Sequence, residues 1–298
     1  MKIIYSKKYL EYNFGPDHPF WPQRAGIFLK KLKKSKISHE ILTPQRATDK
    51  DIFLVHSEEY LKKVKKLAKQ RSSLSIDTPL NPNVLEAAFW SVGGSILALN
   101  LATQGEKAIN LLGGFHHAGI STGSGFCVFN DHSIAIRKFQ KEGKIKKAII
   151  YDLDVHAGQG TQEIFYFDPT VFTISIHQDP TTLYPGTGFS WQKGEGRGKR
   201  YNLNIPLPPG IEEKEYLSVL DSVLPKAKIF NPDVVVLVLG VDTYKKDPLA
   251  NFKLEETTYM KIGEKFKKFS KLAVMFAGGY SKETPRLWLN FLKGLEGN

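Results

Sequence analysis

The amino-acid sequence predicts an α/β fold in which helices flank an open, mostly parallel sheet on both faces. Short β-rich runs alternate along the chain with longer segments that have helical periodicity, as in parallel α/β proteins. Several of the apolar runs end directly in glycine, aspartate or histidine, as expected where parallel strands open onto a ligand-binding edge. No internal repeat or low-complexity linker interrupts this alternation, so we expect a single domain over residues 1–298.

The strands are predicted from short, mostly apolar runs, which is the pattern of buried strands. The run at 148–154 is the most informative, because it turns from apolar to acidic before it ends. The predicted strands cover residues 2–5, 108–112, 148–154, 171–177, 201–206, 233–240 and 272–277.

The helices are predicted in the segments between these strands. Pro22 suits a first helical turn, and Ser57 is a plausible N-cap because two glutamates follow it. The predicted helices cover residues 22–34, 57–70, 83–103, 131–142, 161–167, 213–230, 255–270 and 285–293.

The net charge of +12 raises the question of a nucleic-acid partner. The basic clusters at 30–36, 62–69 and 265–271 carry apolar residues at helical spacing among their lysines, which is typical of a solvated helix face. Lysine dominates over arginine, and no nucleic-acid-binding motif accompanies the clusters. The pattern therefore disfavours a dedicated nucleic-acid surface.

Composition also bears on location. The longest apolar stretch, 234–241, is too short to span a bilayer, and the N-terminus lacks an apolar core of signal-peptide length. Cys127 is the only cysteine, so no intrachain disulfide is possible. We expect a cytoplasmic protein without a membrane partner, and the sequence does not define its oligomeric state.

Polar side chains gather at the ends of the predicted strands. Asp152, Asp154 and His156 are two residues apart, so strand alternation points them to one side. Asp242 follows the strand at 233–240. Since parallel strands present their carboxyl ends at one edge of the sheet, we expect these residues to meet.

Asp154, His156 and Asp242 are the predicted metal ligands. Buried carboxylates are costly unless their charge is compensated. Three protein ligands leave one position open for water, as in catalytic zinc sites. Each residue alone is better explained as a helix cap or a core histidine, but the combination favours a metal. Zn²⁺ is expected, and the two carboxylates are also compatible with Fe²⁺ or another divalent ion.

Further candidates surround this cluster. His116 and His117 follow two glycines, which let the backbone pass close to a site. Asp152 lies deeper on the strand, where it can orient an imidazole. Tyr280 follows the last predicted strand and can donate a hydrogen bond to an oxyanion. The alternatives are a second metal site or loop histidines for the pair, and an ordinary half-buried phenol for Tyr280.

The motifs together resemble those of a known family. In chain order they are G-G-F-H-H-A, S-G-F-C-V-F-N-D, D-L-D-V-H-A-G-Q-G-T-Q, Y-P-G-T-G, G-V-D and A-G-G-Y. They resemble the metal-dependent histone deacetylase superfamily, which includes acetylpolyamine amidohydrolases and acetoin-utilisation proteins and shares its open α/β fold with arginase. The resemblance begins at residues 15–24, covers essentially the whole chain and is greatest to the compact class IV branch.

The resemblance implies a role for each candidate. The three predicted metal ligands match the zinc ligands of the family. His117 matches the general base that later acts as an acid, and His116 its electrostatic partner. Asp152 would orient a histidine of this pair, and Tyr280 would polarise the substrate carbonyl.

The resemblance also implies a narrow channel for an acyl-lysine-like chain. Asp77 matches the aspartate at the channel rim that grips the substrate backbone, and Arg24 matches an arginine beside the internal cavity that handles the leaving acetate. The implied channel residues are Gly125, Phe126, Tyr184, Gly279 and Asp77. The implied potassium ligands are Asp152, Asp154, His156, Ser175 and Ile176.

Two positions depart from the family pattern. Ala157 replaces the second histidine of the motif D-x-H-H-G, and Gln159 stands where an aspartate or asparagine often partners a catalytic histidine. A neutral amide at 159 would tune the basicity of that histidine less strongly. Cys127 lies beside the implied channel, where packing explains it better than nucleophilic catalysis.

These observations predict hydrolysis of an N-acyl amide by metal-activated water, with an acylated lysine or a similar amine as the substrate. One alternative is a deacetylase of acetylpolyamines or other small amides. Another is arginase-like chemistry with two manganese ions, which would need more Asp and His ligands than the strand ends supply. The third is a non-catalytic acyl-lysine or nucleic-acid binding module, against which the retained Tyr280 and histidine pair argue.

Overall fold

The computed structural model describes residues 1–297, and its centre is an eight-stranded sheet of parallel strands. The order across the sheet is β2-β1-β5-β10-β9-β6-β7-β8. These strands are β1 (Lys2–Ile4), β2 (Glu40–Leu42), β5 (Lys107–Asn110), β6 (Ala148–Asp152), β7 (Val171–Gln178), β8 (Asn202–Leu207), β9 (Val234–Leu239) and β10 (Leu272–Phe276). The predicted parallel sheet is confirmed, as is each of the predicted strands within a few residues.

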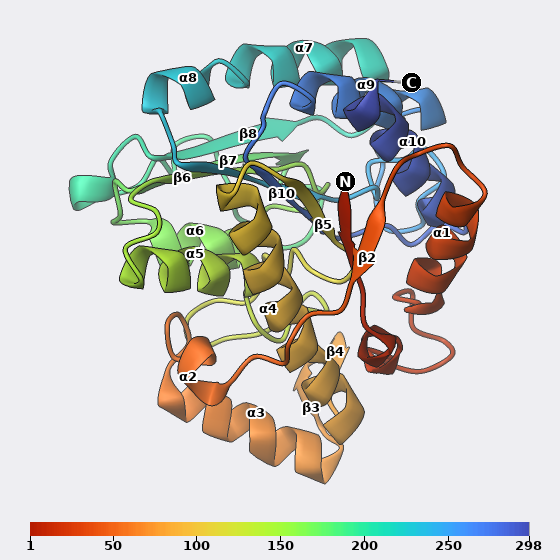
Figure 1. The fold of residues 1–298 in the computed structure, drawn as a ribbon. Helices are drawn as coiled ribbons and strands as arrows, with labels where there is room; N and C mark the ends of the chain where they lie inside the picture. The colour runs from red at the N-terminus through yellow and green to blue at the C-terminus, as the bar shows by residue number, and fades with distance from the viewer. Residues whose placement is uncertain (298) are drawn as a thin grey trace.

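Helices cover both faces of this sheet (Figure 1). The α-helices are α1 (Gln23–Lys33), α2 (Asp49–Ile52), α3 (Glu58–Gln70), α4 (Pro82–Thr103), α5 (Asp131–Lys141), α6 (Gln159–Phe165), α7 (Glu213–Val223), α8 (Lys226–Phe230), α9 (Glu256–Phe266) and α10 (Thr284–Glu296). Helices α7 to α10 lie on one face, and α4, α5 and α6 lie on the other (Figure 1).

The alternation of β6 explains the two layers of helices. Tyr151 points into one core, where its ring meets Phe266 of α9 edge to face. Its neighbour Ile150 points to the opposite face, into a second core that includes Leu99 of α4 and Phe139 of α5. A central parallel strand is buried on both faces in this way, which is why its sequence is apolar throughout.

Some elements differ from the sequence prediction. The predicted helix 213–230 is two helices, α7 and α8, which are separated at Pro225, since proline cannot donate the backbone hydrogen bond of a helix interior. The edge strand β2 and the hairpin of β3 (Ser73–Ser75) and β4 (Thr78–Pro79) were not predicted. The predicted cap is confirmed, because the Ser57 side chain accepts a hydrogen bond from the backbone of Tyr60.

The helix α4 is, among residues 1–297, the one segment with the length and composition of a membrane span. It packs against β5, β9, β10 and α5, and most of the apolar stretch is buried there. A core helix passes the same test, so this is weak evidence for a membrane.

The order of the strands sets the position of the candidate site. Strands β5, β10, β9 and β6 are successive neighbours in the sheet. Their carboxyl ends therefore lie side by side, and the loops that follow them carry His116 and His117, Tyr280, Asp242, and Asp154 with His156.

Candidate metal centre and active site

Asp154, His156 and Asp242 form one buried cluster. One potential ligand atom from each lies within 4.8 Å of the others. The Nδ1 atom of His156 is 3.0 Å from Asp154 Oδ1 and 3.3 Å from Asp242 Oδ2. The backbone N–H of Val155 donates to Asp242 Oδ1 at 3.0 Å, which joins the loop after β6 to the loop after β9. The structure therefore brings the three predicted ligands together.

The cluster fits a divalent metal ion. Asp242 Oδ2 is buried and accepts no hydrogen bond, although a buried carboxylate oxygen normally has a partner. Gly278 leaves the space beside the carboxylates open, because a Cβ atom there would lie 2.1 Å from Asp242 Oδ2 and 2.4 Å from Asp154 Oδ2. A set of two carboxylates and one imidazole is suited to zinc and to other first-row divalent ions.

The electrostatics of the cluster also favour a cation. Burial and the charge of Asp154 raise the pKa of Asp242 well above its usual range. Although burial opposes it, contacts with the two carboxylates raise the pKa of His156 to about 10. Without a metal, the carboxylates thus hold a proton on His156, and a bound cation would replace that charge.

His116 and His117 form a hydrogen-bonded pair beside this cluster. Their Nε2 atoms are 3.1 Å apart, and His116 Nδ1 is 2.7 Å from Asp152 Oδ2. His117 Nδ1 is 2.6 Å from Gln159 Oε1. Burial lowers the pKa of His116 to about 4 and that of His117 well below its usual value, so both imidazoles are neutral near pH 7.

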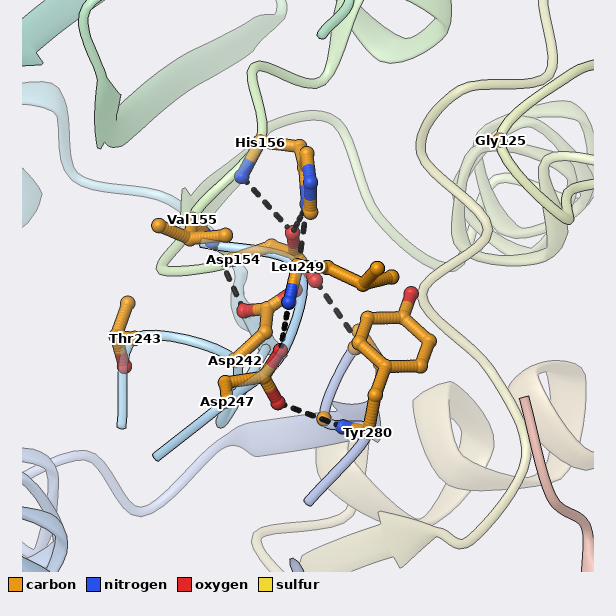
Figure 2. A network of polar contacts seen from close by, with 12 residues as sticks. Gly125, Asp154, Val155, His156, Asp242, Thr243, Asp247, Leu249 and Tyr280 are labelled. Carbon is orange, nitrogen blue, oxygen red and sulfur yellow. Dashed lines mark hydrogen bonds and ion pairs between the residues drawn. The ribbon is translucent and has the colours of Figure 1, made fainter. Parts of the chain in front are cut away.

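Tyr280 reaches the same region from the loop after β10. Its backbone N–H donates to Asp247 Oδ2 at 2.7 Å. Figure 2 shows the ring rising from this anchored backbone beside the carboxylates, with the hydroxyl turned away from Asp247. Burial raises the pKa of Tyr280 well above 10, so the phenol keeps its proton and can donate it in a hydrogen bond.

The predicted channel residues Gly125, Phe126 and Tyr184 contact His117 or Tyr280. The ring of Tyr184 meets that of His117 edge to face at 5.0 Å between centroids. Phe126 meets Tyr280 in the same manner at 5.6 Å. Tyr184 is partly exposed and its hydroxyl is 2.6 Å from Ser124 Oγ, so it belongs to the mouth of the site.

The two remaining channel candidates face other parts of the chain. The carboxylate of Asp77, between β3 and β4, accepts hydrogen bonds from the backbone N–H of Gly125 at 3.0 and 3.2 Å. The backbone oxygen of Gly279 accepts from Arg24 Nη1 at 2.8 Å.

Arg24 is buried beside a small internal cavity of about 20 Å³, which His116, His117 and Tyr280 also line. Its Nη2 donates to the oxygen of Ala277 at 2.9 Å. Burial lowers the pKa of Arg24 to about 10, which still leaves the guanidinium charged. The role of Arg24 toward a leaving acetate stays a prediction.

The potassium candidates lie on adjacent strands. Asp152 of β6 pairs in register with Ser175 of β7, and Ile176 follows it. Ser175 Oγ is 2.8 Å from His177 Nδ1. Asp154 and His156 continue from the end of β6, so the five predicted residues are neighbours.

Sequence reasoning missed two aspartates that hold the loops of the site. Asp131 accepts hydrogen bonds from the backbone N–H groups of Gly114 and Phe115, at 3.1 and 2.8 Å, just before the histidine pair. Asp247 anchors the backbone of Tyr280. Asp131 is the last residue of the motif S-G-F-C-V-F-N-D, so the sequence did contain a pattern that pointed to it. Asp247 lies within a loop, away from any strand end, and no motif marks it.

The sequence of this chain is similar to those of known proteins. The profile of the histone deacetylase domain matches residues 18–295. A probable deacetylase of Methanothermobacter thermautotrophicus is 35% identical over 302 residues, which span 100% of this chain and 91% of that protein. The acetoin utilization protein AcuC of Bacillus subtilis is 34% identical over 320 residues, which span 99% of this chain and 82% of that protein.

Two solved structures share the fold. The crystal structure of the HDA15 HD domain has a TM-score of 0.90 at 28% identity, and the match covers 100% of this chain and 91% of that one. The acetylpolyamine aminohydrolase of Burkholderia pseudomallei has a TM-score of 0.89 at 23% identity, covering 99% and 98% of the two chains. At that identity the second likeness is evidence for the fold alone.

Proposed function

This chain belongs to the histone deacetylase family, and from that premise we propose that it hydrolyses the amide of an N-acylated lysine or a similar amine and releases acetate or another acyl acid. The observation that carries the proposal is the buried cluster of Asp154, His156 and Asp242 directly beside the neutral His116–His117 pair. Residues 1–298 act as one catalytic domain, since β1 and β10, from opposite ends of the chain, both pair with β5.

The proposed metal is Zn²⁺, with Fe²⁺ or another divalent ion compatible with the same donors. Such an ion polarises a carbonyl and lowers the pKa of water from 15.7 towards about 7. A potassium ion near Asp152 and Ser175 is part of the proposal. A cytoplasmic location is also proposed, because the single cysteine, Cys127, allows no intrachain disulfide.

The acid–base work falls to His117. Gln159 Nε2 lies 3.4 Å from the Tyr184 hydroxyl, so Gln159 Oε1 is the atom that accepts from His117 Nδ1–H. A neutral imidazole with a proton on Nδ1 carries its lone pair on Nε2, which in His117 is the atom that faces His116 Nε2 at 3.1 Å. His117 Nε2 is therefore the proposed acceptor of the water proton and its later donor to the leaving amine, a role worth about 10²–10⁴-fold in rate.

Tyr280 is the proposed donor to the developing oxyanion. Its protonated phenol suits this role, and Asp247 fixes its backbone before the substrate arrives. The Phe126 and Tyr184 rings narrow the approach to His117 and Tyr280, which favours an extended acyl-amine chain.

The second candidate substrate class is a small acyl amine such as an acetylpolyamine. The relatives include an acetoin utilization protein and probable deacetylases, which is compatible with a small-molecule substrate as well as with a protein. The Asp77 carboxylate, which would meet a peptide backbone at the rim, is already bonded to Gly125. A nucleic-acid partner is not part of the proposal.

The substitution Tyr280→Phe tests the mechanism. It removes the proposed oxyanion donor and keeps the ring, so kcat for an acetyl-lysine peptide should fall on the order of 10²-fold or more. Tyr166→Phe, on a partly exposed ring away from the site, is the matched control and should keep full activity. A loss below roughly tenfold in Tyr280→Phe would remove Tyr280 from the chemistry.

A further inference from the structure

The backbone makes a strained corner at Gly125 and Phe126. Both residues have positive φ angles, +57° at Gly125 and +66° at Phe126. Glycine adopts this region freely, but in a residue with a side chain the Cβ atom comes too close to the backbone. Such a conformation persists only where its surroundings hold it.

The β3–β4 hairpin supplies the contacts that hold this corner. The N–H of Gly125 donates to the Asp77 carboxylate at 3.0 and 3.2 Å, and the next N–H, of Phe126, donates to Thr78 Oγ1 at 3.0 Å. Two consecutive hairpin residues thus satisfy two consecutive amides. On the opposite side, the Tyr12 hydroxyl donates to the Phe126 oxygen at 2.6 Å.

The Asp77 carboxylate has further partners within the hairpin. The Thr78 hydroxyl donates to Asp77 Oδ1 at 2.9 Å, and the Ser75 hydroxyl donates to the same oxygen. Within the chain, Oδ1 thus accepts from Ser75, Thr78 and Gly125, and Oδ2 accepts from Gly125, so the carboxylate is fixed in place before any substrate binds.

The corner touches two residues of the proposed chemistry. Gly125 packs so closely on the His117 ring that a Cβ atom at position 125 would lie 2.2 Å from His117 Cδ2. Phe126 packs edge to face against Tyr280. A shift of the corner would move Gly125, and the His117 ring that packs against it would move too.

We propose that Asp77 and Thr78 are positioning residues, which hold the Gly125–Phe126 corner and through it the surface against which the His117 ring packs. The inference rests on the proposed function, because it assigns a role within that reaction. It gives Asp77 a role beyond the one that family resemblance implies. Substrates without a peptide backbone should then depend on Asp77 as well.

Steady-state kinetics with two substrates test this inference. In Asp77→Ala and Thr78→Val, kcat should fall on the order of 10-fold to 100-fold for both an acetyl-lysine peptide and acetylputrescine, with little change in KM. Asp77→Asn should be intermediate, because its amide oxygen can still accept from the Gly125 N–H. Ile76→Ser, at the fully exposed tip of the same hairpin, should leave both substrates unaffected. A loss confined to the peptide, and expressed in KM, would overturn the inference.

Amide hydrogen exchange tests the hairpin contacts without any turnover. The amides of Gly125 and Phe126 should be protected in the wild type and in Ile76→Ser, and should exchange faster in Asp77→Ala and Thr78→Val while the β6 and β9 amides stay protected. Unchanged exchange at Gly125 in folded Asp77→Ala would overturn the inference. If the wild type hydrolyses no acyl amine, the proposed function fails, and the exchange result still decides whether the hairpin holds the corner.

Discussion

Gln159 sets the basicity of His117 at the scale of a single residue. An amide oxygen fixes the tautomer of the ring but offers no full negative charge to an imidazolium. Burial, followed by the neighbouring imidazoles, already lowers the pKa of His117. Compared with an aspartate at this position, Gln159 leaves the pKa of His117 lower. The ring therefore stays neutral, and able to accept a proton, down to a lower pH.

The substitution Gln159→Glu should shift the pH profile. A carboxylate beside His117 Nδ1 favours the imidazolium and raises the pKa of His117 by about 1–3 units. Because the base must be unprotonated, the acidic limb of kcat/KM should move to higher pH. Gln104→Glu, at an exposed helix end, is the matched control. An unmoved acidic limb in Gln159→Glu would mean that His117 is not the group titrated.

At the scale of elements, glycines after β9 and β10 let these strand ends lie close to Asp154, which follows β6. A Cβ atom at Gly240, after β9, would lie 2.5 Å from both Cα and Oδ2 of Asp154. Gly278, after β10, donates its N–H to Asp154 Oδ2 at 3.0 Å. The carboxylates can approach one another because these two strand ends carry no side chains.

The substitution Gly278→Ala should therefore weaken metal binding. Its Cβ would contact both carboxylates, and the ligands would have to move apart. We expect substoichiometric metal after dialysis, as measured by elemental analysis, with a corresponding loss of activity. Gly26→Ala, where a Cβ atom meets nothing within 4 Å on α1, should keep its metal. Full metal occupancy in Gly278→Ala would contradict the ligand assignment.

Elements with strong local signals were predictable. The apolar run of β6 and the cap at Ser57 depend on neighbours in sequence, and the structure confirms both. The β3–β4 hairpin was not predicted because its strands are short and polar. Its partners, Gly125 and Phe126, are distant in sequence, so the role of Asp77 was not readable from local pattern.

At the scale of the whole molecule, the site depends on strand order. Strand alternation predicted that Asp152 and Asp154 face the same side, but β6 ends at Asp152 and Asp154 lies in the bend that follows. The sequence also indicated that several strand ends would converge, but not that β10 and β9 lie between β5 and β6. That order comes from long-range pairing, and it brings Tyr280 and Asp242 to the same sheet edge as the histidine pair and His156.

Burial of histidine makes the stability of the fold depend on pH. His56 lies between Tyr60 and Phe129, and its Nε2 accepts from the backbone N–H of Asn130 at 3.0 Å. Burial lowers its pKa to about 4. Below about pH 6.5, His56 is protonated in the unfolded chain but stays neutral in the folded one. The free energy of unfolding therefore falls as the pH falls from about 6.5 to about 4.

Because of His56, the free energy of unfolding should fall by about 2 kcal/mol between about pH 7 and about pH 5. Chemical denaturation of the metal-free wild type and of His56→Gln would measure it. The glutamine oxygen can accept from Asn130 but does not titrate, so the variant should lose about 2 kcal/mol less over that interval. Equal losses in the two proteins would show that His56 does not contribute to the acid sensitivity.

The central claim is that Asp154, His156 and Asp242 hold a metal ion that the hydrolysis requires. The most direct measurement is deacylation by protein stripped of metal and then reconstituted with Zn²⁺ or Fe²⁺, with Asp154→Ala as the blank, on acetyl-lysine and longer acyl-lysine peptides and on acetylputrescine. We predict that turnover disappears with the metal, returns on reconstitution and is absent from Asp154→Ala. Turnover that survives removal of the metal, or that persists in Asp154→Ala, would contradict the account.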